Sequence, residues 1–247
     1  MKTAYNLAID FGNTLVKVAV YKKKKWKYFI SQSKISKKEI EDIIEQFNIH
    51  HCIISSVTTK SVTIEKFLSK KTHALILNEK TKLPVKNLYS TQSSLGKDRL
   101  ASAVAAIKMF PKKNVLIINC GTCITYDLVN DKSEYLGGGI SPGLDMRLKA
   151  LNTFTSKLPL IKKKKVNSTV GNSTESSILN GVMNGAALEV DGFINTYRKK
   201  FSKLKVIVSG GDAGYFASEL KNKIFALPNI VLIGLNEILL FNEQKKG

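Results

Sequence analysis

The residues best suited to chemistry near the start of the chain are Asp10-Phe11-Gly12-Asn13-Thr14, which follow an apolar run. Gly12 allows the backbone to approach a ligand closely, and Asn13 and Thr14 offer side-chain and backbone donors to phosphate oxygens. The Asp10 carboxylate can orient a hydrated Mg²⁺ ion. Because Asn-Thr after glycine is also common in turns, an ordinary hairpin turn is the alternative interpretation.

A second stretch, Asn119-Cys120-Gly121-Thr122-Cys123, repeats this design in the other half of the chain. Asn119 corresponds to Asp10, and Gly121 corresponds to Gly12. Each stretch lies between two apolar, β-branched runs, which predicts two β-hairpins. Two such hairpins, each opening one half of the chain, indicate a duplicated α/β fold whose halves bind a nucleotide from two sides.

Strands that alternate with helices must position these hairpins, and this alternation predicts a mixed or parallel sheet covered on both faces. We expect two lobes, residues 1–111 and residues 112–247. The other expected elements are a strand at 26–30, a helix from Ser36, a helix from Asp98 closed by Pro111, a loop at 82–95, a glycine-dense turn at 135–143, a helix at 144–151 and a long helix at 174–201.

Length and composition limit the class of protein. The chain has 247 residues, 43% of them hydrophobic, which is enough for a substantial core. No signal-like run opens the chain and no stretch approaches the roughly 20 apolar residues of a membrane span, so we expect a soluble, cytoplasmic protein. Cys120 and Cys123 form a C-x-x-C pair, but without a second pair or a histidine at ligand spacing, redox or metal chemistry is disfavoured.

The formal net charge of +20 is high, and lysine blocks at 22–25 and 162–165 contribute much of it. A basic surface attracts nucleic acid non-specifically and steers anionic substrates. Lysine blocks without interleaved aromatic residues or arginines are more typical of solvated surface than of a specific nucleic-acid site. We therefore expect decoration of loops and strand ends, and no specific nucleic-acid partner.

Four signatures in one order closely resemble those of the type III pantothenate kinases: Asp10–Thr14, Gly96-Lys97-Asp98-Arg99, Gly121–Asp127 and Gly137–Gly143. The resemblance spans nearly the whole chain. It implies an α/β, duplicated actin-like (ribonuclease H-like) fold of the actin, sugar-kinase and heat-shock ATPase superfamily, and a homodimer. It also implies transfer of the γ-phosphoryl group of ATP to the 4′-hydroxyl of pantothenate, the first step of coenzyme A synthesis, with Mg²⁺ and a monovalent cation such as K⁺ or NH4⁺.

The resemblance also assigns roles to residues of this chain, with Asp98 as the catalytic base. The residues assigned to ATP are Asp10, Phe11, Gly12, Asn13, Thr14, Leu15, Val16, Lys17 and Thr122. Those assigned to pantothenate are Tyr89, Gly96, Lys97, Asp98, Arg99 and Thr174. Phosphoryl transfer needs donors around the phosphates, a metal and one carboxylate near the attacking hydroxyl, and the Arg99 guanidinium suits the carboxylate of pantothenate. From the residues alone, an N-cap role for Asp98 is the alternative.

One departure from the family pattern lies at Asn119, where the second phosphate motif usually has the aspartate associated with the monovalent cation. Either cation dependence is altered or catalysis is impaired. A catalytically weak or inactive relative with a regulatory, nucleic-acid-associated role is therefore an alternative, supported by Asn119 and the net charge. Asp10, Asp98, Arg99 and Thr122 favour the kinase, and the G-x-D-R signature disfavours a kinase acting on another alcohol.

Overall fold

The computed structural model describes residues 5–56, 61–166 and 168–244, which form two compact units. The first unit comprises residues 1–111, 133–135 and 229–247, and the second comprises residues 112–132 and 136–228. The first unit therefore contains all of the expected N-terminal lobe and, in addition, the C-terminal segment of the chain.

The sheet of the first unit has the strand order β3-β2-β1-β4-β5. Its strands are β1 (Tyr5–Phe11), β2 (Val16–Lys22), β3 (Lys25–Gln32), β4 (Ile49–Ser56) and β5 (His73–Ile76). β1 pairs antiparallel with β2 and parallel with β4, which confirms the first predicted hairpin. The central strands are buried along almost their whole length, as expected for a sheet covered on both faces.

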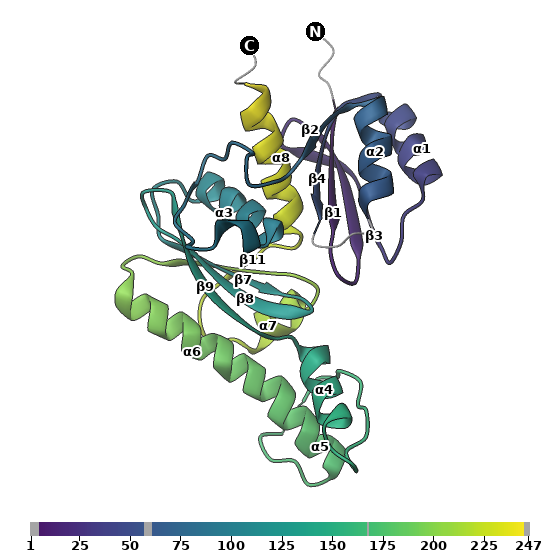
Figure 1. Ribbon diagram of the computed structural model, residues 1–247. Helices are drawn as coiled ribbons and strands as arrows, with labels where there is room; N and C mark the ends of the chain where they lie inside the picture. The colour runs from purple at the N-terminus through teal and green to yellow at the C-terminus, as the bar shows by residue number, and fades with distance from the viewer. Residues whose placement is uncertain (1–4, 57–60, 167, 245–247) are drawn as a thin grey trace. The chain divides into compact units, whose positions relative to one another are not determined.

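Helices α1 (Lys37–Phe47) and α2 (Val62–Lys71) pack against this sheet (Figure 1). Ser36 and Glu39 form a capping box at the start of α1, as the predicted helix start requires. Helices α3 (Lys97–Met109) and α8 (Ile230–Glu243) lie against each other, and α8 also contacts β1, β2 and β4. α8 is apolar around most of its circumference, and a helix of this kind must be buried, so it joins the first unit.

The second unit contains the other predicted hairpin within a sheet ordered β11-β10-β7-β8-β9. Its strands are β7 (Val115–Cys120), β8 (Cys123–Val129), β9 (Glu134–Pro142), β10 (Lys205–Ser209) and β11 (Phe225–Ala226). β7 pairs antiparallel with β8 and parallel with β10. The first residues of β9, Glu134 and Tyr135, belong to the first unit and pair with β6 (Lys86–Asn87).

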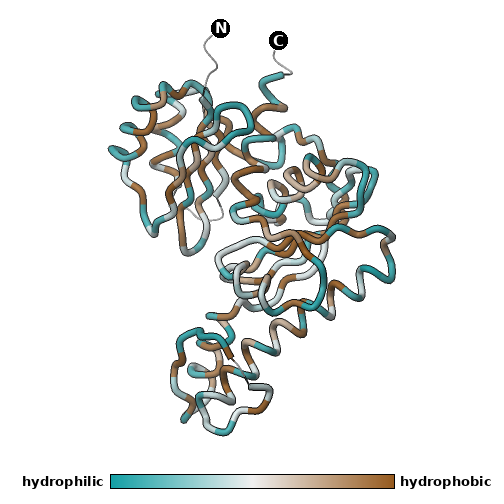
Figure 2. Tube along the Cα trace, turned by 180° about the vertical axis from the view of Figure 1, so that it is seen from behind, coloured by the Kyte–Doolittle hydropathy of each residue, from teal (hydrophilic) through white to brown (hydrophobic). Residues whose placement is uncertain are grey.

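The helices of the second unit are α4 (Leu144–Thr153), α5 (Thr174–Leu179), α6 (Gly185–Lys200) and α7 (Ala213–Glu219). α5 continues into α6 through a π-helical turn at Asn180–Asn184, so the predicted long helix is confirmed. Hydrophobic and hydrophilic residues alternate along this helix (Figure 2), and its buried side packs on β7 and β8.

Two local predictions are wrong. The glycine-dense stretch predicted as a turn is strand β9, in which Gly138 packs so closely that a Cβ there would lie 1.6 Å from the Tyr126 carbonyl oxygen. Here glycine allows two strands to approach and does not mark a turn. The expected loop at 82–95 contains β6 and a 3-10 turn at Gln92–Ser94.

Candidate active site

The first hairpin places Asp10 near the end of β1, opposite Lys17 on β2 and Ser55 on β4. The backbone N–H of Gly12 donates to the Leu15 carbonyl at 3.1 Å and closes the turn. Ser55 lies far from Asp10 in the sequence, so the motif did not include it. The sequence feature that could have identified it is a buried strand that ends in small polar residues.

Apart from Asp10, Gly12 and Lys17, the predicted ATP-binding residues of this hairpin divide into an exposed group and a buried group. Asn13, Thr14 and Leu15 are exposed at the tip, whereas Phe11 and Val16 are buried in the core. Side chains at the tip are therefore open to a ligand, and the two buried residues have only their backbone to offer it.

The side chain of Asp10 is buried, and its Oδ1 has no hydrogen-bond partner among the described residues. Burial raises the pKa of Asp10 to about 7, and the negative charge of Asp98 adds to this rise, although Lys17 opposes it. A buried oxygen without a partner, next to a second carboxylate, is a suitable ligand for a divalent cation. The residues present therefore fit Mg²⁺ at Asp10.

Asp98 lies in the first turn of α3, but Gly96 is the N-cap residue and no side chain caps this helix. The alternative N-cap role for Asp98 is therefore wrong. Its Oδ1 accepts a hydrogen bond from the Arg99 backbone N–H at 2.9 Å. A Cβ at residue 96 would lie 2.5 Å from this oxygen, so the glycine of the G-x-D-R signature gives the carboxylate its space.

The surroundings of Asp98 suit a general base. Burial raises the pKa of the Asp98 carboxyl above its ordinary value, and the backbone N–H and charge of Arg99 only partly oppose this. A catalytic base works best when its pKa is near the operating pH.

Arg99 is 7% exposed, and its guanidinium carbon lies 5.7 Å from the centre of the Tyr89 ring. The Tyr89 ring in turn lies 6.2 Å from that of Tyr135. Tyr89 precedes α3 by a short irregular segment, so the structure brings together two residues predicted to bind the same substrate. A buried guanidinium flanked by an aromatic ring can bind a carboxylate through a planar donor fork.

In the second hairpin, Asn119 pairs with Thr125 on β8 and with Ser209 on β10, and Thr122 is exposed at the tip. The backbone N–H of Gly143 donates to the Thr122 carbonyl at 3.0 Å. A Cβ at Gly143 would lie 2.2 Å from the Gly121 carbonyl oxygen. The glycine at the end of the fourth signature therefore supports this tip by close backbone packing.

Thr174 belongs to the second unit, where it is the exposed first residue of α5. It lines a cavity of about 710 Å³ together with Leu151, Leu158, Ser173 and Ile178. Its role in binding pantothenate stays a prediction.

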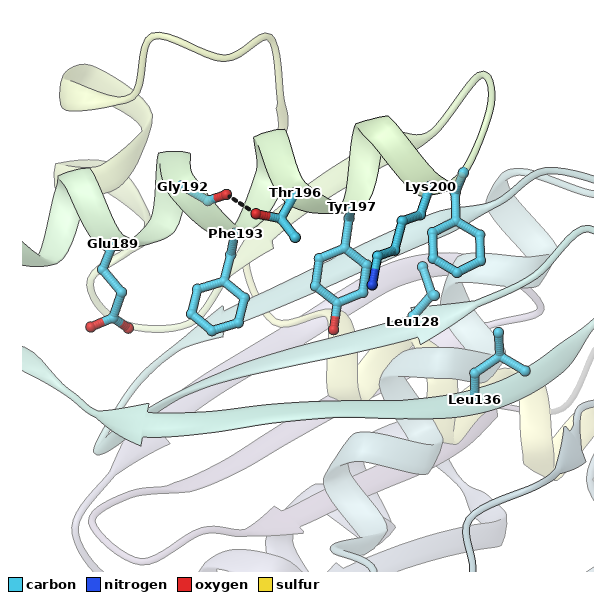
Figure 3. A pocket seen from close by; sticks show the side chains of 9 residues that line it. Leu128, Leu136, Glu189, Gly192, Phe193, Thr196, Tyr197 and Lys200 are labelled. Carbon is cyan, nitrogen blue, oxygen red and sulfur yellow. Dashed lines mark hydrogen bonds between the residues drawn. The ribbon is translucent and has the colours of Figure 1, made fainter.

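A second cavity, of about 680 Å³, lies along α6 and contains none of the predicted site residues (Figure 3). Phe193 and Tyr197 point from α6 toward the strands that carry Leu128 and Leu136. This apolar groove offers few groups that could bind phosphate, so we do not place phosphoryl transfer here.

The sequence profile described as Type III pantothenate kinase matches residues 6–196. A type III pantothenate kinase of Christiangramia forsetii is 45% identical over 245 residues, which cover 97% of this chain and 100% of that relative. The chain belongs to the type III pantothenate kinase family.

Solved structures show the fold of this type III pantothenate kinase family member. A protein described as a Baf family transcriptional activator from Campylobacter jejuni matches with a TM-score of 0.61 and 18% identity over 96% of this chain and 99% of that one. Component A of the (R)-2-hydroxyglutaryl-CoA dehydratase of Acidaminococcus fermentans matches with a TM-score of 0.53 and 14% identity over 98% of each chain. The predicted α/β, duplicated actin-like fold is confirmed.

Among the described residues, no helix is both long and apolar enough to span a bilayer. The cytoplasmic location stays a prediction.

The lysines of both blocks, 22–25 and 162–165, are exposed and lie in loops or at strand ends, as expected. Lys163, Lys164 and Lys165 all form ion pairs with carboxylates. In the other block, Lys24 Nζ lies 3.1 Å from Glu237 Oε1. Part of the positive charge of these blocks is thus neutralised by carboxylates of the same chain.

For this reason we expect any nucleic-acid binding to be weak and indifferent to sequence. Its affinity should fall at least about tenfold between about 50 and 200 mM salt, because such binding depends on counterion release. Fluorescence anisotropy with two labelled duplexes of unrelated sequence, titrated at several salt concentrations, measures both properties. Tight binding of one duplex only, at physiological salt, would instead support the regulatory role.

Proposed function

We propose that this protein transfers the γ-phosphoryl group of ATP to the 4′-hydroxyl of pantothenate, the first step of coenzyme A biosynthesis. The observation that carries this proposal is the Asp98–Arg99 pair of a type III family member, in which a carboxylate with raised pKa lies beside a buried guanidinium. These two neighbouring groups serve the two ends of one small substrate: Asp98 receives the hydroxyl proton, and Arg99 with Tyr89 binds the carboxylate.

The first hairpin binds the phosphates of ATP. Its exposed tip, Asn13 to Leu15, and the backbone around Gly12 offer hydrogen-bond donors, and Lys17 carries a positive charge near Asp10. Asp10 would hold Mg²⁺, which when bound neutralises charge on the phosphates. Thr122, exposed at the tip of the second hairpin, supplies a further contact to ATP.

The proposal includes a cytoplasmic homodimer in which each lobe contributes one phosphate motif. Gly96, Lys97 and Thr174 are proposed to contact pantothenate.

The decisive experiment measures ADP release from ATP and Mg²⁺ with and without pantothenate, followed by mass spectrometry of the product. We expect ADP release to require pantothenate and to yield a single phosphorylated product. Pantothenate lacking the 4′-hydroxyl is the matched control and should compete without being phosphorylated. An equal rate of ADP release with and without pantothenate, or a requirement for a different alcohol, would refute the assignment.

A further inference from the structure

Lys163, in the segment between α4 and α5, forms two short ion pairs within the second unit. Its Nζ lies 2.7 Å from Asp212 Oδ1 and 2.8 Å from Asp145 Oδ2. Its side chain is 31% exposed, whereas those of Lys164 and Lys165 are 59% and 67% exposed. Lys163 therefore differs from its neighbours in a block that looks uniform in sequence.

The two carboxylates that Lys163 joins belong to the segments that support the second hairpin. Asp145 lies in the first turn of α4, whose N-cap residue is Gly143. The backbone N–H of Gly143 donates to the Thr122 carbonyl at 3.0 Å. The backbone N–H of Asp212 donates to the Cys120 carbonyl, also at 3.0 Å. Lys163 thus ties together two segments that each hold one side of the Gly121–Thr122 turn.

The surroundings of Asn119 do not fit a monovalent cation, because such a site would need a negatively charged ligand at this position. Its amide is neutral, and its Oδ1 is crowded against Gly210, where a Cβ would lie only 2.8 Å away. The carboxylate next to this end of the hairpin, that of Asp212, is already neutralised by Lys163.

We propose that Lys163 is a tethered cation that replaces the monovalent ion at the second phosphate hairpin and holds its tip ready for nucleotide without K⁺. This inference rests on the proposed function, because the hairpin must bind ATP or ADP for the substitution to matter. Lys163 is a positioning residue, acting through Asp145 and Asp212 on the backbone around Thr122.

The charge of Lys163 is suited to this role. Partial burial by itself lowers the pKa of an ammonium, but the hydrogen bonds and charges of Asp145 and Asp212 outweigh this and raise the pKa of Lys163 above its ordinary value. The ammonium therefore remains charged at neutral pH. Its two ion pairs engage two of its three N–H donors, one for each carboxylate.

The test measures the dissociation constant of Mg·ADP by titration calorimetry, in KCl and in tetramethylammonium chloride at equal ionic strength. We expect the natural protein to bind ADP equally in both salts. Lys163→Met keeps the length of the side chain without its charge and should bind ADP at least about tenfold more weakly in either salt, as expected for loss of charge-assisted contacts. Lys164→Met, which removes the neighbouring exposed ion pair with Glu175, is the matched control and should leave binding unchanged.

A second pair of variants restores the carboxylate at residue 119. Asn119→Asp should gain a K⁺ response, because an added carboxylate attracts a cation that the amide does not. The double variant Asn119→Asp with Lys163→Met should depend on K⁺ most strongly. A melting curve of each variant with and without K⁺ provides a second readout, in which K⁺ raises the melting temperature of the double variant and not that of the natural protein.

Three results would overturn the inference: strong K⁺ dependence of the natural protein, equal ADP binding by Lys163→Met and Lys164→Met, or identical K⁺ curves for Asn119→Asp and the natural protein. The first and third of these results can be obtained even if the Lys163→Met variant does not fold. If any of these occurs while ADP release still requires pantothenate, only the role of Lys163 fails. If the natural protein binds no ADP, the proposed function fails as well.

Discussion

Asp98→Asn is expected to reduce pantothenate-dependent ADP formation at least about a hundredfold, as expected for loss of a general base. The amide cannot receive the hydroxyl proton, although it keeps the shape of the side chain. Steady-state kinetics at saturating ATP and pantothenate should show the loss mainly in kcat, because the Arg99 guanidinium and Tyr89 ring still bind the substrate.

A thermal melt of the same variant separates catalysis from helix stability. Gly96, not Asp98, caps α3, and the charge of Asp98 contributes to the raised pKa of Asp10. Removing this charge should therefore leave the melting temperature unchanged or slightly higher. Asp42→Asn, an exposed position on α1, is the control and should change neither property. Near-normal turnover with a lower melting temperature would show that Asp98 serves only the helix.

Asp10→Asn is expected to stop turnover and yet stabilise the protein when Mg²⁺ is absent. The pKa of Asp10 is raised from 3.8 to about 7, so the folded state holds its proton more tightly than the unfolded state does. The stability that this carboxyl contributes is therefore fully present below about pH 4 and is lost as the pH rises to about 7. Three pKa units correspond to about 4 kcal/mol of unfolding free energy, so the variant should gain up to about that amount at pH 8.

The measurement is the unfolding free energy from urea denaturation in EDTA, at pH 8 and again near pH 4.5, where the gain should shrink markedly. Adding Mg²⁺ at pH 8 should stabilise the natural protein and leave Asp10→Asn unaffected, because binding to the folded state alone raises stability. A variant that is less stable than the natural protein at pH 8 in EDTA would contradict the burial of an ionised Asp10.

Features that depend on neighbouring residues could be predicted from the sequence. Both hairpins follow from alternating apolar runs around a glycine turn, and the start of α1 follows from Ser36 and Glu39, because these signals act over a few residues. The motifs also singled out Asp10 and, through the family resemblance, Asp98 as the carboxylates expected to act in the reaction. Local preference failed at Gly138, since glycine is typical of turns but here allows two strands to approach closely.

Only the tertiary structure decided which of these groups act on one another. The repulsion between Asp10 and Asp98 and the contact of Arg99 with Tyr89 join separate stretches of the first unit, and no local pattern encodes such distances. Lys163 is indistinguishable in sequence from the lysines beside it. Its role arises because chain folding brings Asp145 and Asp212 to its ammonium, and charge acts through space rather than along the chain.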